Sequence, residues 1–214
     1  MLDNCYCRIE PTDRDGDKKA YQQDIREEVP MPIECRNLSK SYHGKMILDH
    51  WSASIPDGKI TAIMGPSGIG KTTLFRLLAG LEKADDGQIT GLSGKKLSVV
   101  FQEDRLFPQL TVLKNLQIVG EGAENWLGHL GLSKAAHQYP GELSGGMKRR
   151  VSIGRALCHN GDVFLLDEPF QGLDDSTKKD VMDIFLGLKR EKTILLITHD
   201  QREADYLADD ILRF

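Results

Sequence analysis

A short apolar segment that runs directly into a glycine-rich loop constrains the fold of this chain more than any other feature. Residues 60–64 (ITAIM) are largely apolar, and residues 65–72 spell Gly-Pro-Ser-Gly-Ile-Gly-Lys-Thr. A Gly-x-x-x-x-Gly-Lys-Thr sequence between a strand and a helix is the P-loop pattern, which binds nucleotide phosphates. An apolar strand is typical of the centre of a parallel sheet that is covered on both faces. We therefore predict a central strand, a phosphate-binding loop and a helix over residues 72–79.

The residue types of this loop fit the chemistry of a nucleotide and a metal ion. Glycines let successive backbone N–H groups converge on phosphate oxygens, because no Cβ blocks the approach. The start of a helix adds partial positive charge. Lys71 is predicted to reach the β- and γ-phosphates, and the Thr72 hydroxyl to ligate Mg²⁺. The predicted nucleotide contacts in the loop are Gly65, Pro66, Ser67, Gly68, Gly70, Lys71, Thr72 and Thr73. The structural alternative is a glycine turn that only joins strand to helix.

Two carboxylates follow a second apolar segment. Residues 163–166 (VFLL) lead into Asp167 and Glu168. In a parallel sheet, ligands bind at the carboxyl ends of the strands. We expect Asp167 to bind Mg²⁺ through a water and Glu168 to polarise the attacking water; the alternative is a solvated pair at an ordinary strand end.

A histidine ends a third apolar segment, residues 193–198 (TILLIT), which is also predicted to be a strand. A lone histidine at such a place is often structural. Because the P-loop and the carboxylate pair accompany it, we predict that His199 contacts the γ-phosphate.

The rest of the chain alternates short apolar segments with helical ones. Further strands are predicted at residues 33–38, 47–55 and 97–101, and further helices at 111–119, 124–130 and 145–157. Leu74, Leu77, Leu78 and Leu81 are expected on one side of the helix after the P-loop, with Gly80 ending it. This alternation indicates an α/β fold with a mostly parallel sheet. Residues 31–214 are predicted to form the folded domain, with a small helical subdomain at about 102–157, and residues 1–30 a polar, disordered tail.

Composition excludes several classes of function. The formal net charge of −4 over 214 residues argues against a general nucleic-acid binder. The basic triplet at residues 148–150 is predicted to be a solvated helix face. The four cysteines, two of them at Cys5 and Cys7, fit neither a disulfide framework nor a zinc site. No apolar run approaches the roughly 20 residues that cross a bilayer, so we expect a soluble, intracellular protein.

A second glycine segment, Leu143-Ser144-Gly145-Gly146-Met147, follows farther along the chain. A P-loop, this segment and an Asp-Glu strand end, in this order, resemble the nucleotide-binding subunit of an ATP-binding cassette (ABC) transporter. The resemblance covers about residue 33 to the end. It implies a P-loop ATPase core with a mostly parallel sheet, an antiparallel β subdomain and an inserted helical subdomain.

The same resemblance implies roles for residues outside the P-loop. Tyr42 resembles the aromatic residue that stacks on adenine, and Gln102 the glutamine that contacts Mg²⁺ and the membrane-domain interface. Asp174 resembles a residue of the loop that crosses the dimer interface, and His199 the switch histidine. The expected catalytic set is Glu168, His199, Lys71 and Gln102, and the expected metal ligands are Thr72, Gln102 and Asp167.

Family resemblance further implies a head-to-tail dimer that holds each ATP between one P-loop and the partner's Ser144, Gly145 and Gly146. The fifth position of this signature is Met147, where glutamine is frequent. ATP and Mg²⁺ are the implied cofactors. A second cassette, transmembrane permease subunits and a solute-binding protein are the implied partners, at the inner face of the cell membrane.

Residues 101–112 resemble importers of nitrate, sulfonates, taurine and thiamine-precursor pyrimidines, although Gln109 stands where that group commonly has tryptophan. We therefore predict an ATPase that powers solute import. Three alternatives remain at this point: an exporter or lipid-related cassette, a non-transport cassette, and a regulatory cassette with little turnover.

Overall fold

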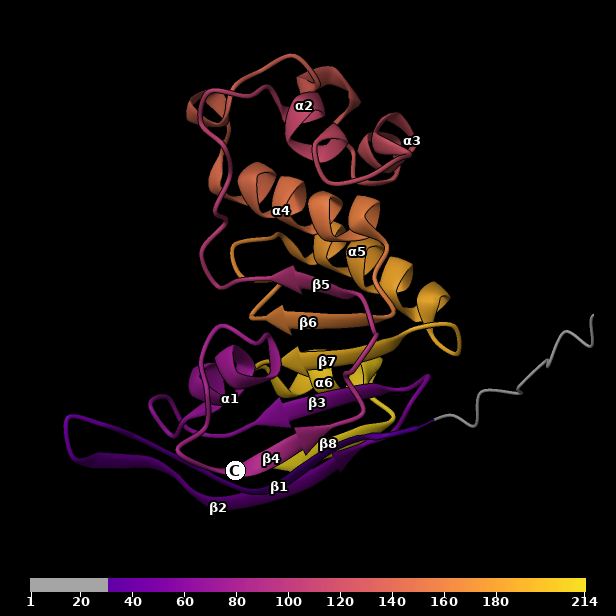
Figure 1. Ribbon diagram of the computed structural model, residues 1–214. Coiled ribbons are helices and arrows are strands. Elements are labelled where there is room, and N and C mark those ends of the chain that lie inside the picture. The colour runs from indigo at the N-terminus through magenta and orange to yellow at the C-terminus, as the bar shows by residue number, and fades with distance from the viewer. Residues whose placement is uncertain (1–30) are drawn as a thin grey trace, which may run out of the picture.

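The computed structural model describes residues 31–214, in which two sheets and several helices form one α/β unit (Figure 1). The tail predicted at residues 1–30, with Cys5 and Cys7, lies outside the described residues. The strands are β1 (Ile33–Tyr42), β2 (Lys45–Ile55), β3 (Ile60–Met64), β4 (Asp86–Thr90), β5 (Leu97–Val100), β6 (Val163–Asp167), β7 (Thr193–Ile197) and β8 (Asp210–Arg213). The helices are α1 (Lys71–Leu78), α2 (Val112–Gln117), α3 (Ala123–His129), α4 (Gly145–His159), α5 (Asp175–Leu188) and α6 (Gln201–Leu207), with 3-10 turns at Ser133–Ala135 and Pro140–Glu142.

The larger sheet brings the predicted site segments to one edge. Its order is β5-β6-β7-β3-β8, and all its neighbouring strands are parallel. Asp167 at the end of β6 pairs with Ile197 of β7, and Ile197 pairs with Ile63 of β3. The P-loop, the carboxylate pair and His199 follow these three adjacent strand ends. The predicted α/β fold with a mostly parallel sheet is confirmed.

The smaller sheet, of order β2-β1-β4, is antiparallel and lies at the opposite end of the molecule from α2 and α3 (Figure 1). Between the two sheets, a core packs β1 and β2 against α1, with Leu74 and Phe75 fully buried. This packing fixes α1, and therefore the helix start that the P-loop precedes.

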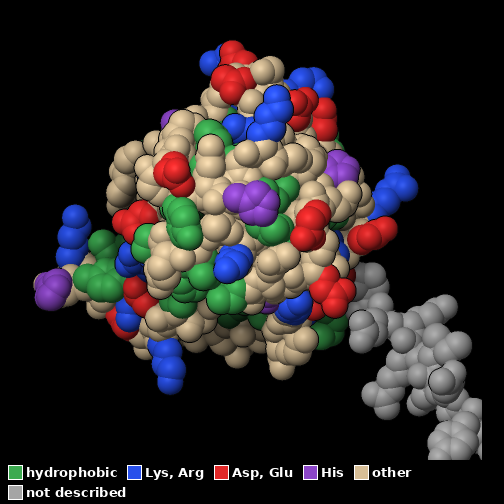
Figure 2. Space-filling model, turned by 90° about the horizontal axis from the view of Figure 1, so that it is seen from above, with side chains coloured by type: hydrophobic (Ala, Val, Ile, Leu, Met, Phe, Trp, Pro, Cys, Tyr) green, Lys and Arg blue, Asp and Glu red, His purple; other side chains and the backbone are tan. Residues whose placement is uncertain are grey.

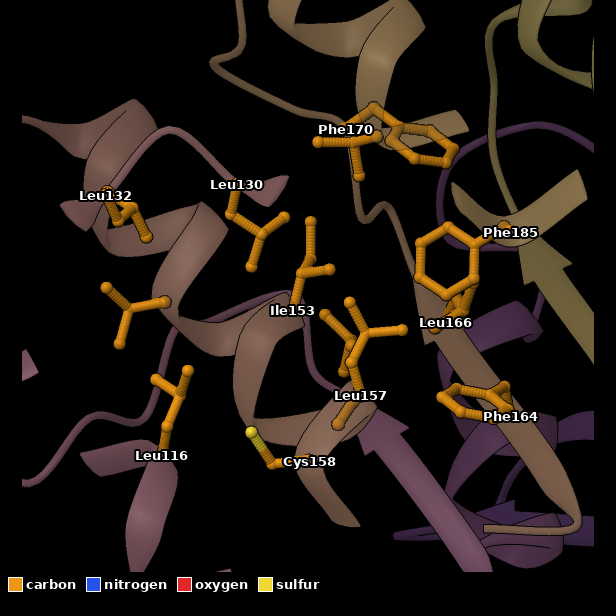
Figure 3. Packing of buried hydrophobic residues seen from close by; sticks show 14 of the residues in the cluster. Leu116, Leu130, Leu132, Ile153, Leu157, Cys158, Phe164, Leu166, Phe170 and Phe185 are labelled. Carbon is orange, nitrogen blue, oxygen red and sulfur yellow. The ribbon is translucent and has the colours of Figure 1, made fainter. Parts of the chain in front are cut away.

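The second core lies between the sheet and α4 and α5. Phe164 and Phe185 meet edge to face, with ring centroids 6.1 Å apart. Figure 3 shows Ile153 and Leu157 of α4 pointing toward this aromatic cluster, while Leu116, Leu130 and Leu132 cover the other side of the same helix. α4 is thus buried on two sides, which ties the helical layer of α2 and α3 to the sheet.

Two expectations about individual residues are wrong. Leu81 is 54% exposed, because α1 ends at Leu78 and Gly80, with φ of +67°, turns the chain away from the helix. Arg149, expected on a solvated face, is only 3% exposed. It points inward from α4, where backbone carbonyls accept its N–H groups.

The surface of the described residues mixes charges of both signs. Figure 2 shows Lys and Arg side chains interspersed with Asp and Glu over one face, with apolar side chains and histidine between them. Within residues 31–214, no helix is long and apolar enough to cross a membrane.

Candidate functional site

A cavity of about 310 Å³ opens at the carboxyl edge of the parallel sheet. Most of the residues predicted to bind nucleotide or metal line it together. The lining consists of Tyr42, Ile47, Ser67, Gly68, Gly70, Lys71, Thr72, Thr73, Gln102, Asp167, Glu168 and Ile197. Residues from distant segments of the sequence therefore meet at one concave surface.

The P-loop is folded around its own lysine. The Lys71 Nζ donates hydrogen bonds to the carbonyl oxygens of Gly65 and Pro66, at 2.7 and 2.9 Å. Gly65 and Pro66, which are predicted to contact the nucleotide, do not line the cavity. Gly70 has φ of +124°, and a Cβ there would lie 3.1 Å from the Ile47 carbonyl oxygen. A side chain at Gly70 would therefore be strained and crowded.

Asp167 and Thr72 form the part of the cavity that suits a divalent cation. Asp167 is buried, and burial, together with the charge of Glu168, raises the pKa of its carboxyl group to about 6. The positive charge of Arg149 and, to a smaller extent, a hydrogen bond from the Thr72 hydroxyl oppose this rise in the pKa. A carboxylate and a hydroxyl side by side, with room for water, are the oxygen ligands that Mg²⁺ uses beside nucleotide phosphates. The donor set fits the predicted metal.

Glu168 and His199 are in direct contact. The His199 Nδ1 lies 2.9 Å from both carboxylate oxygens of Glu168. This hydrogen bond to the carboxylate raises the pKa of His199 above its usual value. His199 does not line the cavity itself; its side chain is 68% exposed beside the rim.

Tyr42 and Gln102 both line the cavity. The Tyr42 hydroxyl donates a hydrogen bond to Glu82, which holds the ring at the side where β1 ends. Gln102 follows β5, and its side chain belongs to the cavity lining. Both positions are compatible with the contacts that the family resemblance implies, which stay predictions.

The signature segment does not share this cavity. Ser144 is the N-cap of α4, where its Oγ accepts a hydrogen bond from the Met147 N–H at 3.3 Å. Ser144 and Gly145 are exposed. A Cβ added at Gly145 would meet open space, whereas one at Gly146 would lie 2.9 Å from the Gly172 carbonyl oxygen.

Asp174 also serves as a helix cap. Its carboxylate accepts hydrogen bonds from the Ser176 hydroxyl at 2.6 Å and from the Thr177 N–H at 3.0 Å, at the start of α5. These bonds, the Ser176 bond above all, lower the pKa of Asp174. The side chain is therefore already bonded within the single subunit, and its predicted contact across a dimer stays a prediction.

Arg149 is a site-adjacent residue that the sequence interpretation missed. Its guanidinium lies directly behind Glu168 and Asp167 and donates to the backbone carbonyl of each. The signal that could have found it is helical spacing, since Arg149 stands four residues before the fully buried Ile153 on the inner face of α4.

A P-loop at the end of a central parallel strand, with an Asp-Glu strand end beside it, defines the class of P-loop nucleotide hydrolases. The family model described as "ABC transporter" matches residues 48–171. The chain belongs to the ABC transporter family, whose members carry an ATP-hydrolysing cassette. This membership confirms the resemblance, the predicted ATPase activity and ATP as the nucleotide.

Similar proteins include two aliphatic sulfonates import ATP-binding proteins. The protein of Paracoccus denitrificans is 40% identical over 190 residues, which is 84% of this chain and 78% of the relative. The protein of Pseudomonas savastanoi pv. phaseolicola is 41% identical over 193 residues, or 85% of this chain and 81% of the relative.

Among solved structures, the dimeric ABC transporter cassette MJ0796 is 28% identical, with a TM-score of 0.77. The match covers 85% of this chain and 94% of that cassette. A second structure of that cassette, with the same scores, is a dimer in a post-hydrolysis state bound to ADP and Pi. These likenesses establish the family and the cassette fold, while the roles of single residues stay predictions.

Proposed function

We propose that this chain is the ATPase subunit of an importer of aliphatic sulfonates and works as a head-to-tail dimer that closes on ATP. The observation that carries the proposal is the separation of two half-sites. Lys71, Thr72, Asp167 and Glu168 line one cavity, whereas Ser144 lies outside it at an exposed helix start. A second subunit can supply the missing half. The names of the relatives support import and the class of solute.

In this mechanism the P-loop binds the phosphates of ATP, and Lys71 exchanges its hydrogen bonds within the loop for hydrogen bonds to the nucleotide. Lys71 leaves the carbonyls of Gly65 and Pro66 and donates to the β- and γ-phosphates. Thr72, Asp167 and Gln102 would hold Mg²⁺, which would neutralise phosphate charge when bound. The helix start of α1 adds its partial charge to the same phosphates.

Glu168 orients the water that attacks the γ-phosphate and accepts its proton. For this role the carboxylate has to be ionised and free on the side that faces the cavity. His199 holds both carboxylate oxygens in the structure, so it keeps Glu168 oriented until a γ-phosphate offers the imidazole another partner. His199 then stabilises the charge that develops on the phosphate.

The permease is proposed to dock beside residues 101–111, the segment between β5 and α2, which we call the Gln102 loop. A second cavity, of about 320 Å³, lies between β5, this loop and α4. Its lining mixes apolar side chains with the guanidinium groups of Arg105 and Arg155, and Phe101 connects it to Gln102. A cytoplasmic segment of a permease fits this combination and would hold the cassette at the inner face of the membrane, with a solute-binding protein on the other side.

Replacement of Glu168 by Gln tests the ATPase mechanism. The variant is expected to bind ATP, to lose about 100- to 1,000-fold in kcat because the proton acceptor is gone, and to accumulate a closed dimer with ATP and Mg²⁺. Steady-state ATPase assays and size-exclusion chromatography measure both effects. Glu191→Gln, at an exposed turn outside the cavity, is the matched control. A Glu168→Gln protein that stays monomeric with full turnover would refute the assignment.

Uptake by cells tests the transport proposal separately. Deletion of the coding sequence is expected to abolish uptake of a radiolabelled aliphatic sulfonate and to leave sulfate uptake unchanged. Restoration by the unmodified chain, and not by Glu168→Gln, links uptake to ATP hydrolysis. Unchanged sulfonate uptake in the deletion strain contradicts the proposed solute.

A further inference from the structure

A buried arginine joins three segments that meet behind the candidate active site. Arg149 is 3% exposed, and its Nε and both terminal nitrogens donate hydrogen bonds. The acceptors are the backbone carbonyls of Phe101, Gln102, Asp167, Glu168 and Pro169 and the carboxylate of Asp104. Such a planar fork of five N–H groups is specific to arginine.

The acceptors on one side surround Glu168. Arg149 Nη2 binds the carbonyls of Asp167, at 2.8 Å, and of Glu168, and Nε binds that of Pro169 at 2.9 Å. The backbone of Glu168 has φ of +48°, which lies in the left-handed region that residues other than glycine rarely adopt. Three successive carbonyls held by one rigid group fix this backbone and therefore the direction of the Glu168 side chain.

The acceptors on the other side belong to the loop after β5. Arg149 Nη1 lies 2.6 Å from the Phe101 carbonyl oxygen, 3.1 Å from that of Gln102 and 3.3 Å from the Asp104 carboxylate. Within residues 31–214, Asp104 is the one carboxylate in hydrogen-bond contact with the guanidinium. The loop of Gln102 and the turn at Glu168 are therefore held to the same side chain.

Arg149 itself belongs to α4, the helix that Ser144 caps. A displacement of α4 would pull on the carbonyls at Glu168 and at Gln102 together. The first turn of α4 is also seated against the segment after Glu168, because Gly146 leaves no room for a Cβ beside the Gly172 carbonyl. The helix that carries the signature and the strand end that carries Glu168 are thus mechanically linked within one subunit.

We propose that Arg149 is a positioning residue for ATP hydrolysis: it holds Glu168 in its left-handed backbone and ties it to the Gln102 loop and to the signature helix. The inference rests on the role proposed for Glu168. Arg149 does not line the cavity itself, and none of its hydrogen bonds goes to a P-loop residue; they reach the cavity only through the backbones of Gln102, Asp167 and Glu168. We therefore expect it to act on turnover through Glu168 and not on the phosphate contacts.

Replacement of Arg149 by Lys tests the proposal, because lysine keeps the charge and loses the fork. The expected result is a fall in kcat of at least about tenfold, with KM for ATP changed less than about threefold, since a small misplacement of a catalytic group affects the chemical step. The pKa of His199, measured by NMR titration, is expected to fall toward its usual value as Glu168 turns away. Arg149→Met, which removes the buried charge, serves if the lysine variant does not fold.

Arg36→Lys is the matched control. Arg36 is exposed on β1, where it pairs with Gln88 of β4, and neither residue lines the cavity. This variant is expected to keep kcat and the His199 pKa. The positioning role is overturned if folded Arg149→Lys protein has the kcat of the unmodified chain. It is also overturned if kcat falls equally in Arg149→Lys and in the control variant. If the unmodified chain does not bind ATP, the proposed function is overturned instead.

Discussion

The two glycine-bearing segments of this cassette differ in what holds them. The P-loop follows a fully buried strand, packs beside Leu48 and Ile47, and encloses its own lysine. The signature begins at an exposed helix start, where the Ser144 side chain caps α4 and a Cβ at Gly145 would meet open space. The first segment is therefore part of the folded core, whereas the second can be altered at Ser144 and Gly145 with the fold intact. This difference separates substitutions that affect a single subunit from those that appear only in the dimer.

Lys71→Ala, a substitution in the P-loop, is predicted to have the largest effect on nucleotide binding. Loss of charge-assisted bonds to phosphate is expected to weaken ATP binding about 10- to 100-fold. Titration with a fluorescent ATP analogue measures the effect. Lys179→Ala, at an exposed position of α5, is the control. Wild-type affinity in Lys71→Ala would mean that the lysine stays bound to Gly65 and Pro66 when nucleotide is present.

The neighbouring glycines of the signature sharpen the comparison. Gly146→Ala is expected to lower the free energy of unfolding by about 1–3 kcal/mol, because its Cβ would press on the Gly172 carbonyl. Gly145→Ala is expected not to lower it, since its Cβ meets open space within the subunit. Urea denaturation followed by circular dichroism compares the two variants.

The same Gly145→Ala change should nevertheless impair the dimer. In the Glu168→Gln background, we expect it to raise the ATP concentration needed for dimer formation, because the added methyl group would stand between the signature backbone and the partner's nucleotide. Size-exclusion chromatography at graded ATP concentrations tests this. Equal dimerisation with and without the Gly145→Ala substitution would place the signature outside the dimer contact.

The smallest effect is expected at the rim, for the pair of His199 and Glu168. The pKa of His199 is raised, so the pair stabilises the fold fully below the unfolded pKa of about 6.5, and the contribution is lost as pH rises through the folded value. Glu168→Gln should lower the His199 pKa measured by NMR. It should also cost more stability at pH 6 than at pH 8, by less than about 1 kcal/mol because His199 is exposed. An unchanged His199 pKa would refute the contact.

The strands and loops around the P-loop were also the part of the molecule that the sequence predicted best. The bounds of β3 and β6 follow from apolar segments that end at turn or charged residues, and parallel pairing then brings Lys71, Asp167 and His199 to one edge. α5 gave no clear signal, since only Val181, Met182 and Phe185 of its 14 residues are buried.

Arg149 illustrates what local sequence cannot supply. Its acceptors are carbonyls from segments distant in sequence, and backbone carbonyls carry no sequence signal. A run of three basic residues favours a solvated face by composition alone. The inward direction of the middle one follows from its place on the helix together with a partner surface that only the assembled fold provides.

Ser144 and Asp174 are both helix caps whose side chains are already fixed by bonds within their own subunit. If a partner meets them, few rotamers remain to be frozen at the moment of contact, and the entropic cost of docking is correspondingly small. The association rate of two such surfaces would be governed by diffusion and orientation. ATP would then control dimerisation mainly through the dissociation rate, that is, through the lifetime of the dimer.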